Sequence, residues 1–484
     1  MSIRNTEPVA LWNHFTDLNA VPRPSKKEER VRAFMVNFGK SLGLETLEDA
    51  IGNVIIKKNA SPGMENRQTV VLQSHLDMVH QKNSDTVFDF DAQGIEMYVD
   101  GDWLKAKGTT LGADNGIGVA SIMAVLASKE IVHPAIEAMF TIDEETGMTG
   151  AMKIDPSNFT GTILLNLDTE DDDELSIGCA GGIDTNTSYS YQEVAVEKES
   201  VSYEISIRGL LGGHSGMDIH RGRGNANKLM NRILYQGISL FPIQLSSFDG
   251  GSLRNAIPRE ATAVISISKQ NKKDFEKFMS DKSTSLKFEY KSVETALNID
   301  WKETQAQTKA VAFDDTMKIL NAIYSVPNGV FRMSPDISDL VEASTSLARI
   351  ILKDGSFVTQ SLQRSSVETT KDDVANAVRS AFENMGCAVV QNGDYPGWQP
   401  NTDSAILKIM AEMYRTKFKE EPKIKACHAG LECGILGAHF PYMDMISFGP
   451  NIRAAHSPDE KVQISSVQKF WGYLLDVLKE IPVK

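Results

Sequence analysis

The chain has 484 residues, which is enough for two or three domains, each with its own hydrophobic core. Its content of 41% hydrophobic and 24% charged residues is ordinary for a soluble globular protein. The net charge of −14, from 50 basic and 64 acidic residues, argues against a nucleic-acid partner and against an anionic membrane surface.

The N-terminal segment and the cysteines indicate a cytoplasmic protein. The segment MSIRNTEPVALWNHFTDLN has no continuous apolar stretch and no small-residue cleavage site, so we expect no signal peptide. No window approaches the roughly 18–20 unbroken apolar residues that a membrane span needs. The 4 cysteines form no CxxC pair, which suits a reducing compartment. They are Cys179, Cys387, Cys427 and Cys433.

Strands and helices are expected to alternate over residues 1–182. The apolar periods and their Gly, Pro and Ser boundaries predict three helices, four strands and one hairpin. The helices are expected at 8–18, 26–42 and 117–128, the strands at 53–58, 69–74, 138–142 and 162–167, and the hairpin at 97–106. Such alternation is typical of an α/β sheet.

Metal-binding side chains follow three of these strands at the point where each strand ends. They are His75, then the adjacent Glu144 and Glu145, then Asp168, while Asp114 stands near the start of the helix between them. An isolated pair of glutamates is more often a solvated turn, and an aspartate at a helix start is more often an N-cap. The repetition favours a functional site, because α/β proteins place their chemistry at the carboxyl ends of strands.

The spacing within these motifs suggests separate roles for neighbouring residues. In His75-Leu76-Asp77 the imidazole can bind a metal while the carboxylate orients the ring. Side chains that leave a strand next to each other point in different directions, so Glu145 can bind a metal while Glu144 faces a substrate. The glycine-rich segment around Asp114 lacks the lysine of a phosphate loop and the glycine order of a dinucleotide site.

The pattern changes at about residue 183 and returns at about residue 393. Residues 183–392 are interpreted as an inserted α+β domain, with strands expected at 203–208, 261–267 and 357–362 and helices at 272–279, 314–322 and 371–384. Residues 393–484 complete the first domain, with helices expected at 404–418, 430–436 and 464–478 and a strand at 444–448. His456 follows this last strand.

The strand-end residues together form a set of ligands for two divalent ions. The set is His75, Asp114, Glu145, Asp168 and His456. It offers each ion one nitrogen and one carboxylate, with a further carboxylate shared between them. This mixed nitrogen and oxygen ligation suits Zn²⁺, with Mn²⁺ or Co²⁺ as substitutes. A metal pair of this kind supplies a water nucleophile at neutral pH.

Five motifs in this order resemble those of the co-catalytic zinc peptidases, the superfamily that includes acetylornithine deacetylase and carnosinase. They are SHLDMVH, GADNGIG, FTIDEETG, LNLDTED and SFGPNIRAAHSPDE. Within the superfamily, the bacterial aminoacyl-histidine (Xaa-His) dipeptidases are the most similar branch. The resemblance covers nearly the whole chain, including GGHSGMDIHRGRGNAN and SLQRSS of the inserted segment.

This resemblance implies a role for each matching residue of the metal site. His75 and Asp168 match the ligands of one zinc, and His456 and Glu145 match those of the other. Asp114 matches the carboxylate that bridges the two ions, Glu144 the general base and Asp77 the residue that orients the first histidine.

The resemblance also implies functions for the inserted segment. In the family this segment is a lid that also mediates homodimerisation, and its histidine contacts the scissile carbonyl oxygen, which matches His214 here. Arg364 matches an arginine that grips the substrate carboxylate, and Asn255 resembles a lid residue near the substrate. From the residues alone, His214 can equally be an ordinary loop histidine and Arg364 can pair with an acidic surface.

The sequence therefore predicts a cytoplasmic, homodimeric dizinc dipeptidase that hydrolyses Xaa-His dipeptides, including β-alanyl-histidine. Two alternatives remain open at this point. The first is a related amide hydrolase, such as an N-acyl-amino-acid deacylase or a tripeptide aminopeptidase. The second is a catalytically inactive, peptidase-like binding protein.

Overall fold

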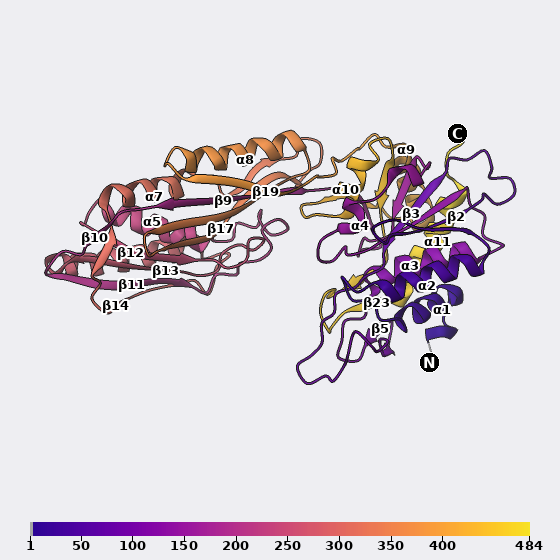
Figure 1. Cartoon of the computed structure of the whole chain (residues 1–484), viewed down its shortest axis with the longest axis horizontal. Coiled ribbons are helices and arrows are strands. Elements are labelled where there is room, and N and C mark those ends of the chain that lie inside the picture. The colour runs from indigo at the N-terminus through magenta and orange to yellow at the C-terminus, as the bar shows by residue number, and fades with distance from the viewer. Residues whose placement is uncertain (1–2) are drawn as a thin grey trace. The chain divides into compact units, whose positions relative to one another are not determined.

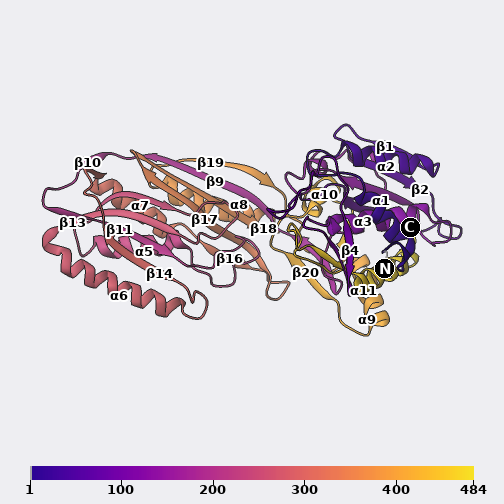
Figure 2. The ribbon, with the colours of Figure 1, turned by 90° about the horizontal axis from the view of Figure 1, so that it is seen from below.

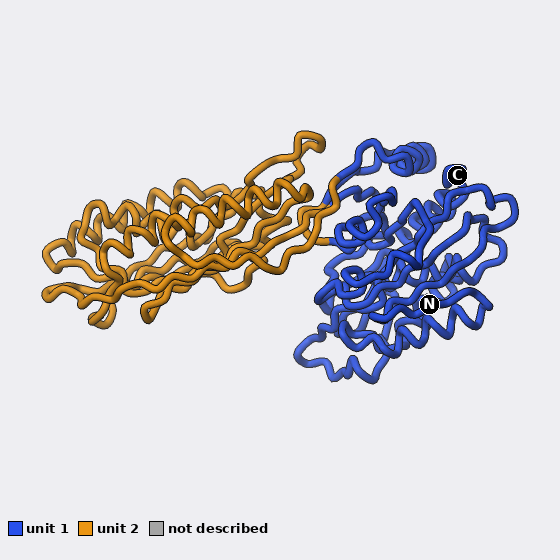
Figure 3. The backbone as a smooth tube through the Cα atoms, turned by 45° about the horizontal axis from the view of Figure 1, so that its top comes forward, with its two compact units in different colours: residues 1–178, 400–426, 431–484 blue, residues 179–399, 427–430 orange. Residues whose placement is uncertain are grey.

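The computed structural model describes residues 3–484, which fall into two compact units (Figure 3). Unit 1 contains the chain up to residue 178 together with residues 400–426 and 431–484. Unit 2 contains residues 179–399 and 427–430. The expected insertion of 183–392 lies within unit 2, which extends further at both ends and adds the short segment 427–430.

Unit 1 is built on a mixed sheet of 8 strands in the order β1-β2-β6-β3-β7-β21-β8-β20 (Figure 1). Neighbouring strands β6, β3, β7 and β21 are parallel, whereas β1 and β2 run antiparallel at one edge. Every residue of β3, β6 and β7 is buried, as expected for parallel strands covered on both faces. The strands are β1 (Glu45–Glu48), β2 (Val54–Lys58), β3 (Val70–His75), β6 (Ile136–Thr141), β7 (Ile163–Asn166), β8 (Glu174–Cys179), β20 (Lys423–Cys427) and β21 (Asp444–Ser447).

Helices and a small second sheet complete unit 1. The α-helices are α1 (Val9–Asn19), α2 (Glu29–Ser41), α3 (Ala113–Ala127), α4 (Thr149–Met152), α9 (Ala405–Phe418), α10 (Glu432–His439) and α11 (Ile464–Lys479). The small sheet has the order β22-β23-β5-β4 and contains the hairpin that the sequence predicts. Its strands are β4 (Met97–Asp100), β5 (Trp103–Ala106), β22 (Ile452–Arg453) and β23 (Lys461–Gln463). None of the helices in residues 3–484 is long and apolar enough to cross a membrane.

Helix α3 is the most deeply buried helix of unit 1, and this burial explains its composition. Its sequence is apolar or small all around, and nearly every residue from Ala113 to Leu126 is buried. Its residues pack with Leu11, Trp12 and Phe15 of α1 in one hydrophobic cluster. The start of α3, which carries Asp114, is therefore held by a rigid core.

Unit 2 is an antiparallel sheet with helices on one face (Figures 2 and 3). The strand order is β14-β11-β13-β12-β17-β18-β9-β19, with β16 paired to β17 and a separate pair formed by β10 and β15. The strands are β9 (Gly181–Ser190), β10 (Glu193–Ala195), β11 (Ser200–Arg208), β12 (Gln244–Gly250), β13 (Ala261–Ser268), β14 (Asn298–Glu303), β15 (Lys309–Val311), β16 (Gly329–Met333), β17 (Val341–Lys353), β18 (Ser356–Ser365) and β19 (Ala388–Tyr395). The helices are α5 (Ala226–Ile238), α6 (Lys272–Tyr290), α7 (Phe313–Ser325) and α8 (Glu368–Glu383).

The expected fold class, an α/β domain with a mixed sheet plus an α+β domain, is confirmed, while several element boundaries differ from the prediction. The span of α3 begins at Ala113, but the backbone of Asp114 and Asn115 is non-helical, so its regular part begins close to the expected residue 117. Helix α6 continues to Tyr290 instead of ending at 279. Strand β17 escapes sequence reasoning because its first half, VEASTS, is buried despite its polar residues. Such buried polar residues hide the alternation by which strands are predicted.

Candidate metal centre

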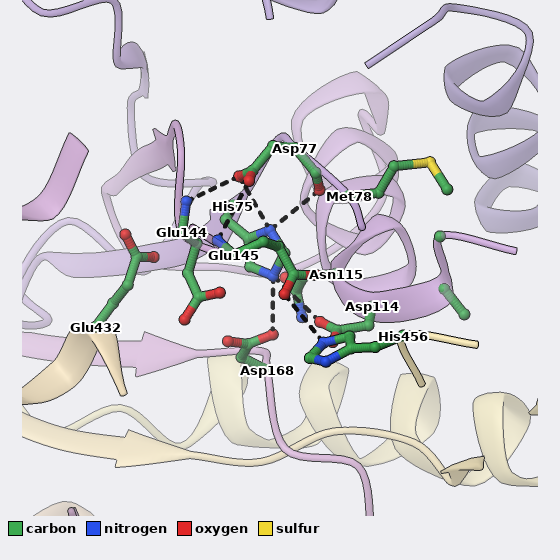
Figure 4. Close-up of polar contacts among 12 residues, drawn as sticks. His75, Asp77, Met78, Asp114, Asn115, Glu144, Glu145, Asp168, Glu432 and His456 are labelled. Carbon is green, nitrogen blue, oxygen red and sulfur yellow. Dashed lines mark hydrogen bonds and ion pairs between the residues drawn. The ribbon is translucent and has the colours of Figure 1, made fainter. Parts of the chain in front are cut away.

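Four adjacent parallel strands of unit 1 deliver most of the expected metal ligands to one edge of the sheet (Figure 4). His75 is the last residue of β3, and Asp168 follows β7. The Glu144-Glu145 pair follows β6, and His456 lies beyond β21 and β22. The carboxyl ends of neighbouring parallel strands meet at one sheet edge, so residues far apart in the sequence come together there.

The two histidines face one shared carboxylate. His75 Nε2 lies 3.1 Å from Asp114 Oδ1, and His456 Nε2 lies 3.2 Å from Asp114 Oδ2. Each histidine also has a carboxylate of its own. Asp168 Oδ1 is 3.5 Å from His75 Nε2, and Glu145 Oε2 is 3.0 Å from His456 Nε2. Asp114 thus stands between two equivalent nitrogen–carboxylate pairs.

The arrangement fits divalent metals. His75, Asp114 and Asp168 have ligand atoms that all lie within 4.8 Å of one another, as do Asp114, Glu145 and His456. Glu145 Oε1 and Asp168 Oδ1 are buried atoms without a hydrogen-bond partner. A buried carboxylate oxygen left without a donor is costly unless a cation compensates it. Imidazole nitrogens and carboxylate oxygens are ligands that Zn²⁺ accepts.

Asp114 does not serve as a helix cap. The backbone of Asp114 is non-helical with a ψ of 112°, and within residues 3–484 the hydrogen bonds of its carboxylate go to two histidines and not to backbone N–H groups of α3. Its carboxylate is directed at the two histidines instead (Figure 4). The interpretation of Asp114 as a plain N-cap is therefore wrong.

Glu144 makes different contacts from its neighbour Glu145. Ligand atoms of Glu144, His75 and Glu145 all lie within 4.8 Å of one another. Among the described residues, however, Glu144 forms no ion pair with either histidine of the site. Burial raises the pKa of Glu144 well above its usual range; the nearby His75 charge opposes this and the carboxylates of Asp168 and Glu432 reinforce it. A carboxylate of raised proton affinity is suited to general-base work near neutral pH.

The surrounding carboxylates raise the pKa of both histidines. Burial disfavours protonation of His75, but Asp168, Asp114 and Asp77 outweigh it and raise its pKa well above the usual value. Hydrogen bonds to Asp114 and Glu145 raise the pKa of His456 to about 11, although burial opposes this. The cluster therefore attracts cations, whether protons or metal ions.

Asp77 links the first histidine to the glutamate turn. His75 Nδ1 lies 3.2 Å from the Asp77 carbonyl oxygen and 3.4 Å from Asp77 Oδ1. The Asp77 carboxylate also accepts the backbone N–H groups of Glu144 at 3.1 Å and Glu145 at 3.3 Å. One buried carboxylate thus orients the imidazole and holds the backbone of both glutamates.

Glu460 is a buried site residue that sequence reasoning missed. Its carboxylate accepts four consecutive backbone N–H groups, those of Leu111 at 2.7 Å, Gly112 at 3.0 Å, Ala113 at 2.8 Å and Asp114 at 3.3 Å. It therefore shapes the loop that presents Asp114. Its place in SPDE, shortly after His456, is the only sequence signal.

Arg23 is a second missed residue, and it lies in the connection between α1 and α2. Its buried guanidinium donates to the carbonyl oxygens of Leu76 at 3.0 Å and Asp77 at 3.1 Å and to Asn19 Oδ1 at 3.0 Å. It ties the turn after β3 to α1. Its positive charge also offsets the carboxylates around it.

His214 of unit 2 is held as a hydrogen-bond donor at Nε2. Its Nδ1 accepts the backbone N–H groups of Gly216 at 3.1 Å and Met217 at 2.9 Å. Burial, with the charge of Arg364, lowers the pKa of His214 to about 4, so the ring is neutral at pH 7. Because Nδ1 accepts, the proton of the neutral ring resides on Nε2.

Arg364 of unit 2 is a buried cation without an anionic partner. Its Nη1 donates to Tyr395 Oη at 2.8 Å, its Nη2 lies 3.5 Å from His214 Nε2, and its buried Nε has no hydrogen-bond partner. No ion pair joins it to a carboxylate within residues 3–484, although its charge acts on Asp184. His428 is also buried in unit 2, and its Nε2 lies 2.7 Å from Ser344 Oγ.

Asn255 lies beside His214 but has a backbone role in this structure. Its carbonyl oxygen accepts the N–H of Ser215 at 2.8 Å, while its side chain is exposed. His214 and Ala256 form an isolated β-bridge, so Asn255 is held next to the histidine loop.

Comparison with known proteins defines the class. The model of Peptidase family M20/M25/M40 matches residues 71–480. The chain belongs to this family and is a peptide hydrolase, as its motifs predict.

Two full-length relatives narrow the class further. The chain is 41% identical over 480 residues to the cytosol non-specific dipeptidase of Escherichia coli (strain K12), covering 99% of this chain and 98% of that protein. It is 42% identical to aminoacylhistidine dipeptidase from Vibrio alginolyticus, whose crystal structure matches with a TM-score of 0.95 over 100% of this chain and 99% of that chain. Aminopeptidase PepT from Bacillus cereus ATCC 10987, at 16% identity and a TM-score of 0.56 over 98% of each chain, shares the fold.

Proposed function

We propose that the protein is a dipeptidase that uses two divalent metal ions, normally zinc, and prefers Xaa-His substrates, including β-alanyl-histidine. The observation that carries the metal assignment is the position of Asp114, whose two oxygens face His75 and His456 at 3.1 and 3.2 Å. The names of the two full-length relatives support the dipeptidase assignment.

The metals and the residues of unit 1 have separate tasks. His75 and Asp168 would hold one ion, His456 and Glu145 the other, and Asp114 both; when bound, the pair supplies a nucleophilic water at neutral pH. Glu144 takes the proton from the attacking water and gives it to the leaving amine, a contribution of about 10²–10⁴ in rate. Asp77 keeps His75 and the glutamate turn in place.

Residues of unit 2 are proposed to recognise the substrate. His214 donates its Nε2–H to the scissile carbonyl oxygen, where negative charge develops during attack. Arg364 binds the carboxylate of the dipeptide, because a buried guanidinium without an anion is ready to accept one in a bidentate manner. Asn255 contributes to the same substrate region.

Substrate screening tests the proposal against its alternatives. Carnosine, Gly-His, other dipeptides, tripeptides and N-acetyl amino acids are incubated with the protein after chelation of metals and again after addition of zinc. We expect zinc-restored cleavage of dipeptides, fastest for Xaa-His. Preferred cleavage of tripeptides or N-acetyl amino acids would point to a related amide hydrolase. Absence of any metal-dependent turnover would point to a binding protein.

Assembly and location complete the proposal. We propose a cytoplasmic homodimer that pairs through unit 2, because β14 and β19 are sheet edges whose unpaired backbone groups offer a route for association. The name of the Escherichia coli relative supports the cytoplasmic location. Sedimentation of the metal-loaded protein at micromolar concentration tests the dimer, and a monomer would contradict it.

A further inference from the structure

A tyrosine of unit 2 contacts the buried arginine of the same unit. Tyr395 is the last residue of β19, and its hydroxyl accepts a hydrogen bond from Arg364 Nη1 at 2.8 Å. Gly182 of β9 lies opposite both residues, so the three form a row across the neighbouring strands β18, β9 and β19. Tyr395 lies outside the five sequence motifs and outside the SLQRSS segment that contains Arg364.

The middle residue of this row lets the tyrosine approach the arginine. A Cβ atom at position 182 would lie 2.7 Å from Tyr395 Oη and 2.8 Å from two carbons of its ring. Nonbonded heavy atoms prefer a separation of about 3.5–4.0 Å, so no side chain fits there without moving the tyrosine. Glycine within a strand often marks such a close approach. The Tyr395 hydroxyl thus reaches Arg364 across a position that has no side chain.

The backbone of Tyr395 is held as well as its hydroxyl. Lys371 of α8 is buried, and its Nζ donates to the Tyr395 carbonyl oxygen at 2.9 Å. The same ammonium group pairs with Glu368 at 2.8 Å and with Asp394 at 2.6 Å. Tyr395 is therefore a fixed support for the arginine and not a mobile surface residue.

This support leaves the charge of Arg364 available. Burial raises the pKa of the Tyr395 hydroxyl above its ordinary value, although the Arg364 charge opposes this, so the hydroxyl is neutral at pH 7. Asp184, on which the Arg364 charge acts, is already paired with Arg254. Arg364 Nη2 lies 3.5 Å from His214 Nε2, and Arg364 Nε is buried without a hydrogen-bond partner in the described part of the chain. The donors on Nη2 and Nε thus remain for a ligand.

We propose that Tyr395 is a positioning residue for substrate recognition, whose hydroxyl orients the Arg364 guanidinium so that its remaining donors bind the C-terminal carboxylate of the dipeptide. Bidentate binding of a carboxylate requires the plane of the guanidinium to be set. An arginine that is held before the substrate arrives also loses less rotamer freedom on binding. This inference rests on the proposed function, in which Arg364 binds that carboxylate.

The first test is Tyr395→Phe, which removes the hydroxyl and keeps the ring over Gly182. Loss of a hydrogen bond to a charged group changes a binding constant by about 10- to 100-fold. The carboxylate is bound equally in the ground state and in the transition state, so its weaker binding raises KM and leaves kcat unchanged. We expect KM for Gly-His to rise by about 10-fold, with kcat and metal content unchanged.

A double-mutant cycle shows whether Tyr395 acts through Arg364. The ratio kcat/KM for Gly-His is measured for Tyr395→Phe, Arg364→Ala and the double variant, from initial rates at substrate concentrations below KM. Without the guanidinium the hydroxyl has nothing to orient. Tyr395→Phe should then change kcat/KM by less than about twofold in the Arg364→Ala background. Arg364→Lys, which keeps the charge but has no guanidinium plane, repeats the cycle with a side chain closer in size.

Tyr189→Phe is the matched control. Tyr189 lies in β9 of the same sheet, opposite Phe357 at the other end of β18 from Arg364. Its hydroxyl donates to Asp315 Oδ1 at 2.7 Å, so this variant also removes a tyrosine hydroxyl that is bonded to a charged group. We expect KM and kcat to stay at their wild-type values.

The outcomes separate the inference from the function on which it rests. An unchanged KM for Tyr395→Phe overturns the inference. So does an equal loss of kcat/KM with and without the Arg364 guanidinium, because the tyrosine would then act independently of the arginine. Wild-type kcat/KM in Arg364→Ala would instead refute the proposed carboxylate site, and a wild-type protein that cleaves no dipeptide would refute the proposed peptidase function.

Discussion

Replacing Glu460 by glutamine should weaken metal binding without touching a ligand. The Glu460 carboxylate uses both oxygens to accept backbone N–H groups from Leu111 to Asp114. Glutamine keeps one acceptor oxygen and turns an N–H₂ group toward the remaining donors. Each buried donor left without a partner costs about 1–3 kcal/mol, so loss of two acceptor contacts costs about 2–6 kcal/mol. The loop that presents Asp114 must shift to relieve this cost.

Competition with a chromophoric chelator measures the metal affinity of the Glu460→Gln variant. Loss of a residue that orients metal ligands lowers metal affinity by about 10- to 100-fold, and we expect this range for Glu460→Gln. Denaturant unfolding of the metal-free protein measures the accompanying loss of stability. Glu137→Gln is the control, since its carboxylate also accepts backbone N–H groups, at 2.9 Å from Thr160 and 3.0 Å from Gly161, but away from the metal centre. Wild-type metal affinity in Glu460→Gln would refute the reasoning.

Three further predictions follow from the site. Glu144→Gln should retain both metals but lose at least about 10²-fold in kcat, and loss of a metal measured by atomic absorption would show that Glu144 is a ligand. His214→Ala should lower kcat by about 10²–10³-fold, with a smaller change in KM and full metal content, whereas a kcat near wild type would make His214 an ordinary loop residue. The metal-free protein should lose stability as pH rises from about 5 to 8. The reason is that the folded site binds more protons than the unfolded chain: the pKa of His456 is raised to about 11, that of Glu460 to about 7 and that of Asp168 to about 6. Metal bound to His456 and Asp168 would take the place of their protons, so thermal unfolding of the loaded protein should show a smaller decline over the same range.

The candidate metal ligands could be found from the sequence because their signal is local. An apolar strand followed by a histidine or a carboxylate can be seen in a short window, and His75, Glu145 and Asp168 each stand in such a window. The parallel neighbours of β3 then bring these ends together without further information.

The residues that support the site could not be found in this way, because their hydrogen-bond partners lie far away in the sequence. Glu460 contacts a loop that begins at residue 111, and Glu432 contacts β3 and β6 from the start of α10. Arg23 serves the turn after β3 from a connection between two helices. A lone charged residue in a polar segment gives no sign that folding will bury it. Strand β17 was missed for a related reason, since its buried polar side chains make half of it resemble a loop.

The position of β21 has a consequence for how the protein is made. This strand, Asp444–Ser447, lies inside the sheet of unit 1 between β7 and β8, although residues 179–399 of unit 2 separate it from both strands in the chain. The sheet and the candidate ligand set that includes His456 thus remain incomplete until synthesis has passed the whole of unit 2. Domains otherwise fold from the N-terminus during translation, at about 5–20 residues per second. A prematurely terminated chain that stops before residue 444 lacks both a central strand and His456, so truncated products of this protein cannot form an active enzyme.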